Sequence, residues 1–282
     1  MNTQTHRAIG VFDSGIGGLT VVRALMERLP FENIIYFGDT ARVPYGIKSV
    51  ETINRYAAQI TDFLIKQDVK MLVVACNTMA AVAHQTIVDL SHVPVAAIAS
   101  QTIVESVPVL EVIDASARMA VQNSKTKSIG VIGTPATINS NAYARAIHLL
   151  DRDARVFSQA CPLFVPLVEE GWFDHPATRL IAQEYLKPVI AEQVDTLVLG
   201  CTHYPLLKPL LQEIMGSSVK LIDSAEAMAD IAADLIDQKK IGNIDGKPAD
   251  YTFYVSDLPY RFQTIGERFL GRTLGRVELK SL

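Results

Sequence analysis

Short apolar runs alternate along the chain with longer segments whose apolar residues recur at helical spacing. Strands are expected over residues 9–12, 33–37, 129–132 and 251–256, and two further strands are expected to end at Cys76 and Cys201. Helices are expected over residues 19–29, 51–66, 79–90, 224–239 and 261–270. Strands that alternate with helices predict an α/β fold with a doubly wound parallel sheet.

The second half of the chain repeats the strand pattern of the first half. Residues 129–134 mirror residues 9–14 at an offset of 120, and residues 192–203 align without a gap to residues 67–78 at an offset of 125. The repeat predicts two pseudo-symmetric parallel-sheet domains that face each other across a cleft. The expected division is a discontinuous first domain of residues 1–111 and 223–282, and a second domain of residues 112–222.

One segment interrupts this regularity. Residues 85–88 (QTIV) recur as 101–104, and residues 93–95 (VPV) recur as 107–109, which is the pattern of a local tandem duplication. Insertion of 14 residues into a packed strand would shift the register of its side chains. We therefore expect residues 96–109, or an equivalent unit, to form a surface loop or an extra helical turn.

Composition narrows the functional classes. The 282 residues are 49% hydrophobic and 20% charged, which is ordinary for a globular enzyme with two domains. The net charge is −4 and no basic run is present, so a nucleic-acid partner is not expected. No signal peptide or membrane span is expected either, and three cysteines without a Cys-x-x-Cys pair fit a reduced, cytoplasmic protein.

Two of the cysteines lie in matching positions. Cys76 and Cys201 each end a buried apolar run and precede a predicted turn into a helix. Ligands of open α/β sheets bind at this carboxyl edge, and a helix N-terminus there lowers the pKa of a thiol. Two such thiols in a duplicated architecture suggest a paired site, whereas Cys161 lacks this context and is assigned to packing.

Several polar residues beside these turns leave alternatives open. His203 can be a metal ligand or a proton relay, and the relay is favoured because no compact set of ligands surrounds it. Asp13 can cap the following helix or face the cleft, and Glu169 can be solvated or line the cleft. The glycine-rich turn at residues 15–18 resembles a dinucleotide fingerprint only weakly, because Thr20 occupies the place of its third glycine. Residues 39–48 predict a loop with an exposed aromatic side chain at Tyr45.

Five motifs together resemble bacterial glutamate racemase, in order and over nearly the whole chain. They are FDSGIGG (12–18), RVPYG (42–46), ACNT (75–78), IGTPAT (132–137) and LGCTHYP (199–205). The resemblance implies two pseudo-symmetric α/β domains that interconvert L- and D-glutamate without a cofactor and supply D-glutamate for peptidoglycan. Residues 93–109 depart from the family's pattern. The resemblance is therefore a weaker guide to the geometry between the domains than to the chemistry.

The resemblance also implies a role for each matching residue. Cys76 and Cys201 correspond to the two acid/base thiols, assisted by Asp13, Glu169 and His203. The residues that match the family's substrate-binding positions are Asp13, Ser14, Tyr45, Gly46, Asn77, Thr78, Thr202 and His203. No metal is implied, and a homodimer is compatible with the sequence.

Elementary chemistry agrees with this reading. Inversion at Cα removes a proton from one face and returns one to the other, so two groups must flank the carbon, and a thiol can serve as base or acid. The alternatives are racemisation of aspartate or a hydantoin with the same two cysteines, and a non-catalytic small-molecule-binding module with structural cysteines. Tight nucleotide binding that survives Cys76→Ser would favour the binding module.

Overall fold

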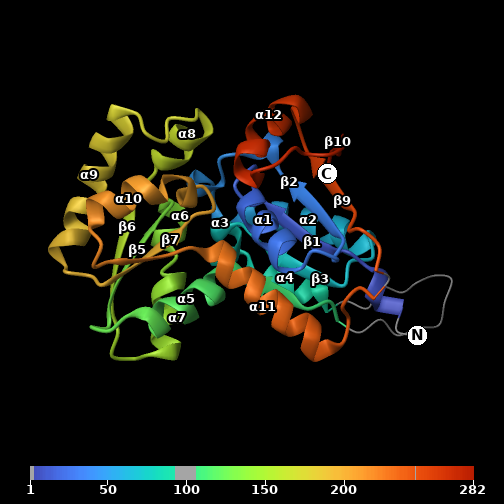
Figure 1. The fold of residues 1–282 in the computed structure, drawn as a ribbon, viewed down its shortest axis with the longest axis horizontal. Helices are drawn as coiled ribbons and strands as arrows, with labels where there is room; N and C mark the ends of the chain where they lie inside the picture. Colours follow the sequence, from blue (N-terminus) through green and yellow to red (C-terminus); the bar gives the residue numbers. More distant parts are fainter. Residues whose placement is uncertain (1–2, 93–105, 245) are drawn as a thin grey trace.

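The computed structural model describes residues 3–92, 106–244 and 246–282, and these residues form two parallel β-sheets surrounded by helices (Figure 1). The strands are β1 (Ile9–Asp13), β2 (Ile34–Gly38), β3 (Met71–Val74), β4 (Val109–Glu111), β5 (Ser128–Gly133), β6 (Arg155–Ala160), β7 (Thr196–Gly200), β8 (Lys220–Ile222), β9 (Tyr251–Val255) and β10 (Val277–Leu279). One sheet has the order β10-β9-β2-β1-β3-β4, and the other has the order β6-β5-β7-β8. The α/β class with parallel sheets predicted from the sequence is therefore confirmed.

The two sheets share one topology. The order β2-β1-β3-β4 in the first sheet matches β6-β5-β7-β8 in the second, strand for strand along the chain. In the first sheet, β2 pairs with one side of β1 and β3 pairs with the other side. In the second sheet, β6 and β7 flank β5 in the same way. Ligands of open α/β sheets bind at the carboxyl ends of strands where the order reverses in this way. These points lie at the ends of β1 and β3, and of β5 and β7.

The central strands are buried along their whole length. All residues of β1, β3, β5 and β7 are buried, because helices cover both faces of a doubly wound sheet. This is why the sequence shows continuous apolar runs there and no alternation of polar and apolar residues.

The helices are α1 (Leu19–Arg28), α2 (Val50–Lys66), α3 (Asn77–Val82), α4 (His84–Ser91), α5 (Val112–Asn123), α6 (Pro135–Asn139), α7 (Ala142–Leu150), α8 (Phe164–Glu169), α9 (Pro176–Ala191), α10 (Lys208–Met215), α11 (Ser224–Lys239) and α12 (Pro259–Leu270). Short 3-10 turns are η1 (Thr3–His6), η2 (Thr40–Arg42), η3 (Tyr45–Ile47) and η4 (Tyr204–Leu207). In the first half, α1 packs against α11 and α12, and α2 packs against α3 and α4.

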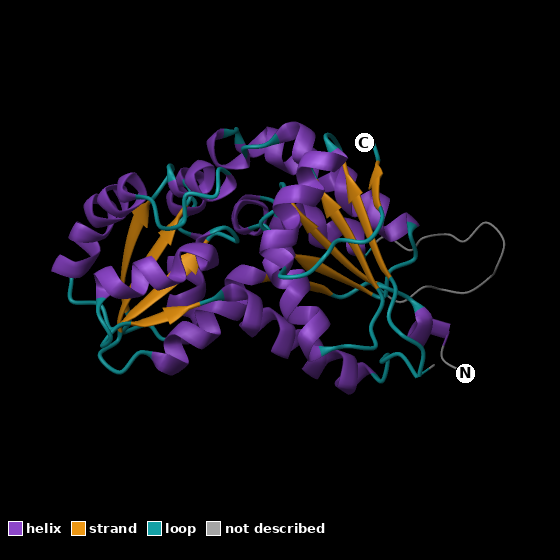
Figure 2. Cartoon of the chain, turned by 45° about the horizontal axis from the view of Figure 1, so that its top comes forward, coloured by secondary structure: helices purple, strands orange, loops and turns teal. Residues whose placement is uncertain are grey.

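The chain passes between the sheets twice. It leaves the first sheet after β4 through α5, and it returns from the second sheet after β8 through α11. Figure 1 labels these two helices, which pack against each other, and Figure 2 shows helical segments between the two sheets. The sequence tail then adds β9, which was predicted, and β10, which was not, to the first sheet.

Helix starts follow from local side chains. The Asp223 carboxylate accepts a hydrogen bond from Ala225 N at 2.9 Å and caps α11, which ends at Lys239 as expected. Thr134 caps α6 in the same way, since its hydroxyl accepts from Thr137 N at 3.3 Å. This second cap lies at the carboxyl end of β5, beside the functional site described below.

The single helix predicted over residues 79–90 is wrong. The structure has α3 and α4 instead, with Ala83 between them in a non-helical conformation. The Asn54 side chain donates to Val82 O at 3.1 Å and accepts from the Thr86 hydroxyl at 2.5 Å. The amide thus bonds to the backbone carbonyl of Val82, the last residue of α3.

Most of the predicted insertion, residues 96–105, lies outside the described residues. Within its described part, residues 106–108 have no regular structure, and Val109 is the first residue of β4. Among the described residues, no helix combines the length and apolar character needed to cross a bilayer. The domain boundaries at residues 111/112 and 222/223 remain a prediction.

Candidate active site

A cavity of about 320 Å³ lies at the carboxyl ends of the central strands of both sheets. Its volume is at the low end of the ~300–1,000 Å³ typical of small-molecule sites. Every site residue predicted from the sequence lines it: Asp13, Ser14, Tyr45, Gly46, Cys76, Asn77, Thr78, Glu169, Cys201, Thr202 and His203. The turns after β1, β3 and β7 therefore meet at one place, although they are far apart in the sequence.

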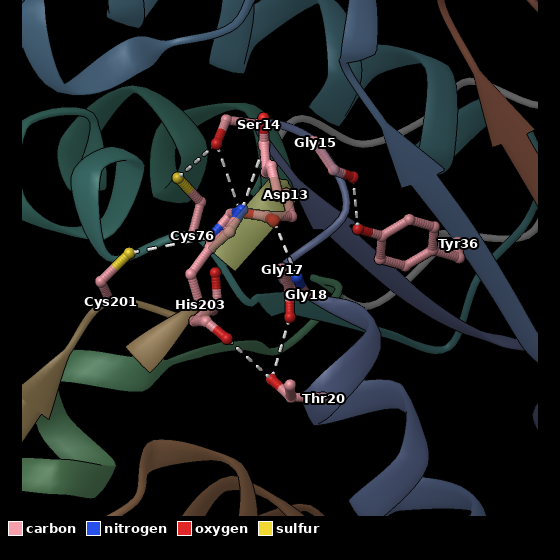
Figure 3. Close-up of polar contacts among 12 residues, drawn as sticks. Asp13, Ser14, Gly15, Gly17, Gly18, Thr20, Tyr36, Cys76, Cys201 and His203 are labelled. Carbon is pink, nitrogen blue, oxygen red and sulfur yellow. Dashed lines mark hydrogen bonds and ion pairs between the residues drawn. The ribbon is translucent and has the colours of Figure 1, made fainter. Parts of the chain in front are cut away.

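Cys76 is the N-cap residue of α3 and is 4% exposed. Its Sγ lies 3.5 Å from Ser14 Oγ, as Figure 3 marks, and Cys76 and Cys201 both line the cavity. Burial raises the pKa of the Cys76 thiol well above its ordinary value, and the nearby charge of Asp13 raises it further. The expectation that the helix N-terminus lowers this pKa is wrong, because desolvation and the carboxylate outweigh it.

Asp13 combines the two roles that the sequence left open. Its Oδ2 accepts a hydrogen bond from Gly18 N at 2.7 Å and so closes the glycine-rich turn before α1. The same residue lines the cavity and is only 1% exposed. At Gly18 a Cβ atom would lie 2.7 Å from Asp13 Cβ, so the close approach requires glycine. The hydrogen bond from Gly18 N thus fixes a carboxylate that belongs to the cavity lining.

Cys201 lies in a different local setting from Cys76. It follows β7 directly but leads into a turn and the 3-10 segment η4, not into an α-helix as its counterpart does. His203 Nδ1 lies 3.8 Å from Cys201 Sγ, as the dashed line in Figure 3 marks. The second thiol therefore has an imidazole as its neighbour where the first has a carboxylate.

His203 is buried between two acidic partners. Its Nε2 lies 3.2 Å from Glu169 Oε1, which the last residue of α8 supplies. Burial lowers the pKa of His203, but the interactions with Cys201 and Glu169 outweigh it and raise the pKa to about 10. An imidazolium at neutral pH follows, and it places a positive charge beside the Cys201 sulfur.

Hydroxyl and amide groups complete the lining. Thr78 and Thr134 come from different halves of the molecule, and their Oγ1 atoms are 3.1 Å apart. Thr134 Oγ1 is also 3.0 Å from Thr137 Oγ1. Sequence reasoning did not select Thr134 as a site residue, although it lines the cavity. Its place 120 positions after Ser14 in the internal repeat is the signal that could have found it.

Tyr45 is not the exposed aromatic predicted from the sequence. It is 2% exposed, and its hydroxyl donates to the buried carboxylate of Asp39. Arg42 Nε and Ser256 Oγ bind the same carboxylate at 2.6 and 2.7 Å. The Asp39 carboxylate thus connects the loop to the first sheet, and it is the hydrogen-bond acceptor of the Tyr45 hydroxyl.

Glycines let the two halves approach each other closely beside the cavity. A Cβ atom at Gly17 would lie 2.3 Å from Thr202 Oγ1 and 2.5 Å from His203 Nδ1. At Gly46 it would lie 2.8 Å from Thr134 Cβ. Side chains at these two positions would hold the turns apart.

Cys161 lies at the end of β6 and is fully buried, and its Sγ donates to Gln159 O at 3.7 Å. It is not among the residues that line the cavity. Within the described part of the chain, no group of three or more His, Cys, Asp or Glu side chains is arranged to hold a metal ion.

Comparison with known proteins gives consistent results. A family model described as Asp/Glu/Hydantoin racemase matches residues 103–232. The glutamate racemase of Syntrophus aciditrophicus is 65% identical over 98% of this chain and 97% of its own length. That of Neisseria meningitidis serogroup A is 56% identical over 100% of this chain and 99% of its own length. The crystal structure of Francisella tularensis glutamate racemase in complex with D-glutamate has a TM-score of 0.89 and 42% identity, with 98% of each chain covered.

Proposed function

The chain belongs to the glutamate racemase family, and we propose that it interconverts L- and D-glutamate through two thiols, Cys76 and Cys201, without a cofactor. One observation carries this proposal. The two cysteines come from equivalent turns of two sheets with the same topology, and both line one cavity. Racemisation needs two proton-transfer groups on opposite faces of Cα, which one thiol cannot supply.

The surroundings of the two thiols differ in charge, and those of Cys76 favour its protonated form. Burial and the Asp13 carboxylate keep the Cys76 thiol protonated, since both raise its pKa. The His203 cation lies 3.8 Å from the Cys201 sulfur. Each turnover needs one thiol protonated and the other ionised, and the form with protonated Cys76 is the one that accepts L-glutamate.

Each direction of the reaction uses the thiols in opposite roles. With L-glutamate, the Cys201 thiolate takes the α-proton: the Cα–H bond breaks and an S–H bond forms. Cys76 then gives its proton to the other face of the carbanion and becomes the thiolate. With D-glutamate the same steps run in reverse. Asp13 and His203, beside different thiols, assist Cys76 and Cys201 respectively, and Glu169 holds the imidazolium.

Substrate binding must rely largely on neutral donors. Among the described residues that line the cavity there is no lysine or arginine. The carboxylates are therefore held by side chains of Ser14, Asn77, Thr78 and Thr202 and by backbone N–H groups, including those of Tyr45 and Gly46. Asp13 and Glu169 supply negative charge for the substrate ammonium.

The physiological proposal follows from family membership. The product D-glutamate would serve peptidoglycan synthesis. The proposal includes two catalytic domains, residues 1–111 with 223–282 and residues 112–222, whose cleft holds the substrate.

A circular-dichroism assay of the purified chain tests this function. With L- or D-glutamate and no added cofactor, the signal should decay to zero from either side. Aspartate serves as the matched control, because it retains both carboxylates and lacks one methylene group. Racemisation of aspartate at a comparable rate, or no change with glutamate, would refute the assignment.

A further inference from the structure

A hydrogen bond joins the two halves of the molecule directly beside the cavity. The Tyr143 hydroxyl donates to Asn77 Oδ1 at 2.5 Å, and each residue is 2% exposed. Tyr143 lies on α7, which follows β5 of the second sheet, and Asn77 is the first residue of α3, next to Cys76. Asn77 lines the cavity, whereas Tyr143 is not among the lining residues. Tyr143 is therefore connected to the cavity by its hydrogen bond to Asn77.

The other end of the Asn77 amide is unsatisfied. Its Nδ2 is buried and has no hydrogen-bond partner among the described residues. A buried donor without a partner is destabilising, and such groups in native proteins call for a physical explanation. Because Asn77 lines the cavity, a ligand with an acceptor oxygen can satisfy this donor.

Tyr143 also contacts the turn that carries the second thiol. A Cβ atom at Gly200, the residue before Cys201, would lie 3.0 Å from Tyr143 Cε2. The ring therefore packs closely against the end of β7 while its hydroxyl bonds to the residue after Cys76. One side chain thus spans the two turns that hold the thiols.

We propose that Tyr143 is a positioning residue that fixes the Asn77 amide so that Nδ2 donates to a carboxylate of the substrate. This inference rests on the proposed function. An asparagine amide can turn over and exchange its donor for its acceptor at little intrinsic cost. With Oδ1 bonded to the tyrosine, the donor faces the ligand. In the opposite orientation Oδ1 would face the carboxylate and repel it.

Tyr143→Phe tests the proposal, because it removes the hydroxyl and keeps the ring that packs on Gly200. We expect KM for both enantiomers and the calorimetric Kd for D-glutamate to rise by about 3- to 10-fold, the effect of one hydrogen bond. The effect on kcat should be smaller. Tyr204→Phe is the matched control, since Tyr204 is also buried in the second half and its hydroxyl donates to Cys161 O at 2.9 Å. It should leave Kd unchanged.

Two further variants separate positioning from a general loss of structure. In an Asn77→Ala background, the additional Tyr143→Phe substitution should have almost no effect on Kd, because the tyrosine acts through the amide. Asn77→Asp keeps an acceptor for Tyr143 but presents no donor, so binding should fall far more than in Tyr143→Phe. Full additivity in the double variant, or an Asn77→Asp variant with native Kd, would overturn the proposal.

The same measurements distinguish this inference from the function on which it rests. If the wild type binds glutamate but does not racemise it, the proposed activity fails while the Kd comparison still decides the role of Tyr143. If the wild type racemises glutamate and Tyr143→Phe binds it with native affinity, only the inference fails. Absence of glutamate binding by the wild type would overturn both.

Discussion

His203 Nε2 lies 3.2 Å from Glu169 Oε1, and the same ring presents Nδ1 to Cys201 Sγ at 3.8 Å. Cys76 has a different neighbour, since the charge of Asp13 acts on it and raises its pKa. The two thiols are thus equivalent in topology and opposite in electrostatic environment. The predictions below test what this difference does.

Cys76→Ala and Cys201→Ala should each reduce kcat for racemisation by more than about 10²-fold, because neither thiol can reach the other face of Cα. Cys161→Ala is the matched control, since this thiol is also buried but does not line the cavity. It should keep near-native turnover in the circular-dichroism assay. Substantial turnover by either of the first two variants would disprove the two-thiol mechanism.

Asp13→Asn and His203→Asn should affect different proton transfers. The two enantiomers have equal free energy. In every variant, kcat/KM for L-glutamate must therefore equal kcat/KM for D-glutamate. If Asp13 assists Cys76, its loss should enlarge the primary isotope effect with α-deuterated D-glutamate. His203→Asn should do so with α-deuterated L-glutamate, because general acid–base assistance of about 10²- to 10⁴-fold makes proton transfer at the affected thiol more rate-limiting.

The same isotope effects can also contradict the division of Asp13 and His203 between the two thiols. Equal isotope effects in both directions for both variants would mean that the assistance is not divided between the faces. Asp13 would then act only by closing the turn through Gly18 N.

Gly17→Ala should impair catalysis by separating the two halves of the site. The new Cβ atom would lie 2.3 Å from Thr202 Oγ1 and 2.5 Å from His203 Nδ1. Relieving such contacts costs typically ~1–3 kcal/mol, so we expect kcat/KM to fall by about 5- to 100-fold. Gly275→Ala is the control, because no described atom lies within 4 Å of its Cβ position. Equal kcat/KM for the two variants would contradict this account of the close approach.

Glu111 should make stability depend on pH. Burial raises the pKa of Glu111 to about 7, although His84 Nδ1 at 2.6 Å opposes the shift. Because the folded pKa exceeds the unfolded value, this contribution to stability is present below about pH 4.5 and is lost as the pH rises through about 7. Between pH 5 and pH 8 the wild type should lose ~1–3 kcal/mol of unfolding free energy relative to Glu111→Gln.

Urea unfolding at the two pH values measures this difference. Glu184→Gln, at an exposed position of α9, is the control and should follow the wild type at both pH values. A Glu111→Gln variant whose stability relative to the wild type is the same at pH 5 and pH 8 would contradict the raised pKa.

The internal repeat explains how much of the site could be predicted from sequence. Cys76 and Cys201 end matching apolar runs, which place each thiol at the carboxyl edge of its own sheet, and the internal repeat predicts two such sheets that face one cleft. Thr134 belongs to the same repeat and was missed only because its side chain is unremarkable in isolation. The local context of Cys201 differed from that expected, because η4 and not an α-helix follows its turn.

Other features arise only from packing between distant segments. The Glu169–His203 contact depends on where the end of α8 lies, and the Tyr143–Asn77 bond joins helices of different halves. No periodicity encodes either pair. The raised pKa of Cys76 is likewise a result of burial beside Asp13, which a rule about helix termini cannot anticipate.

The most direct test of the central claim is racemisation of L-glutamate in D₂O, followed by chiral separation and mass analysis at low conversion. With two thiols on opposite faces, the proton taken by Cys201 differs from the one that Cys76 returns. The account predicts that D-glutamate formed by the purified chain without cofactor carries one deuterium at Cα, while the remaining L-glutamate carries almost none. D-glutamate that retains its original hydrogen, or deuterium entering L-glutamate as fast as racemisation proceeds, would contradict the two-thiol mechanism.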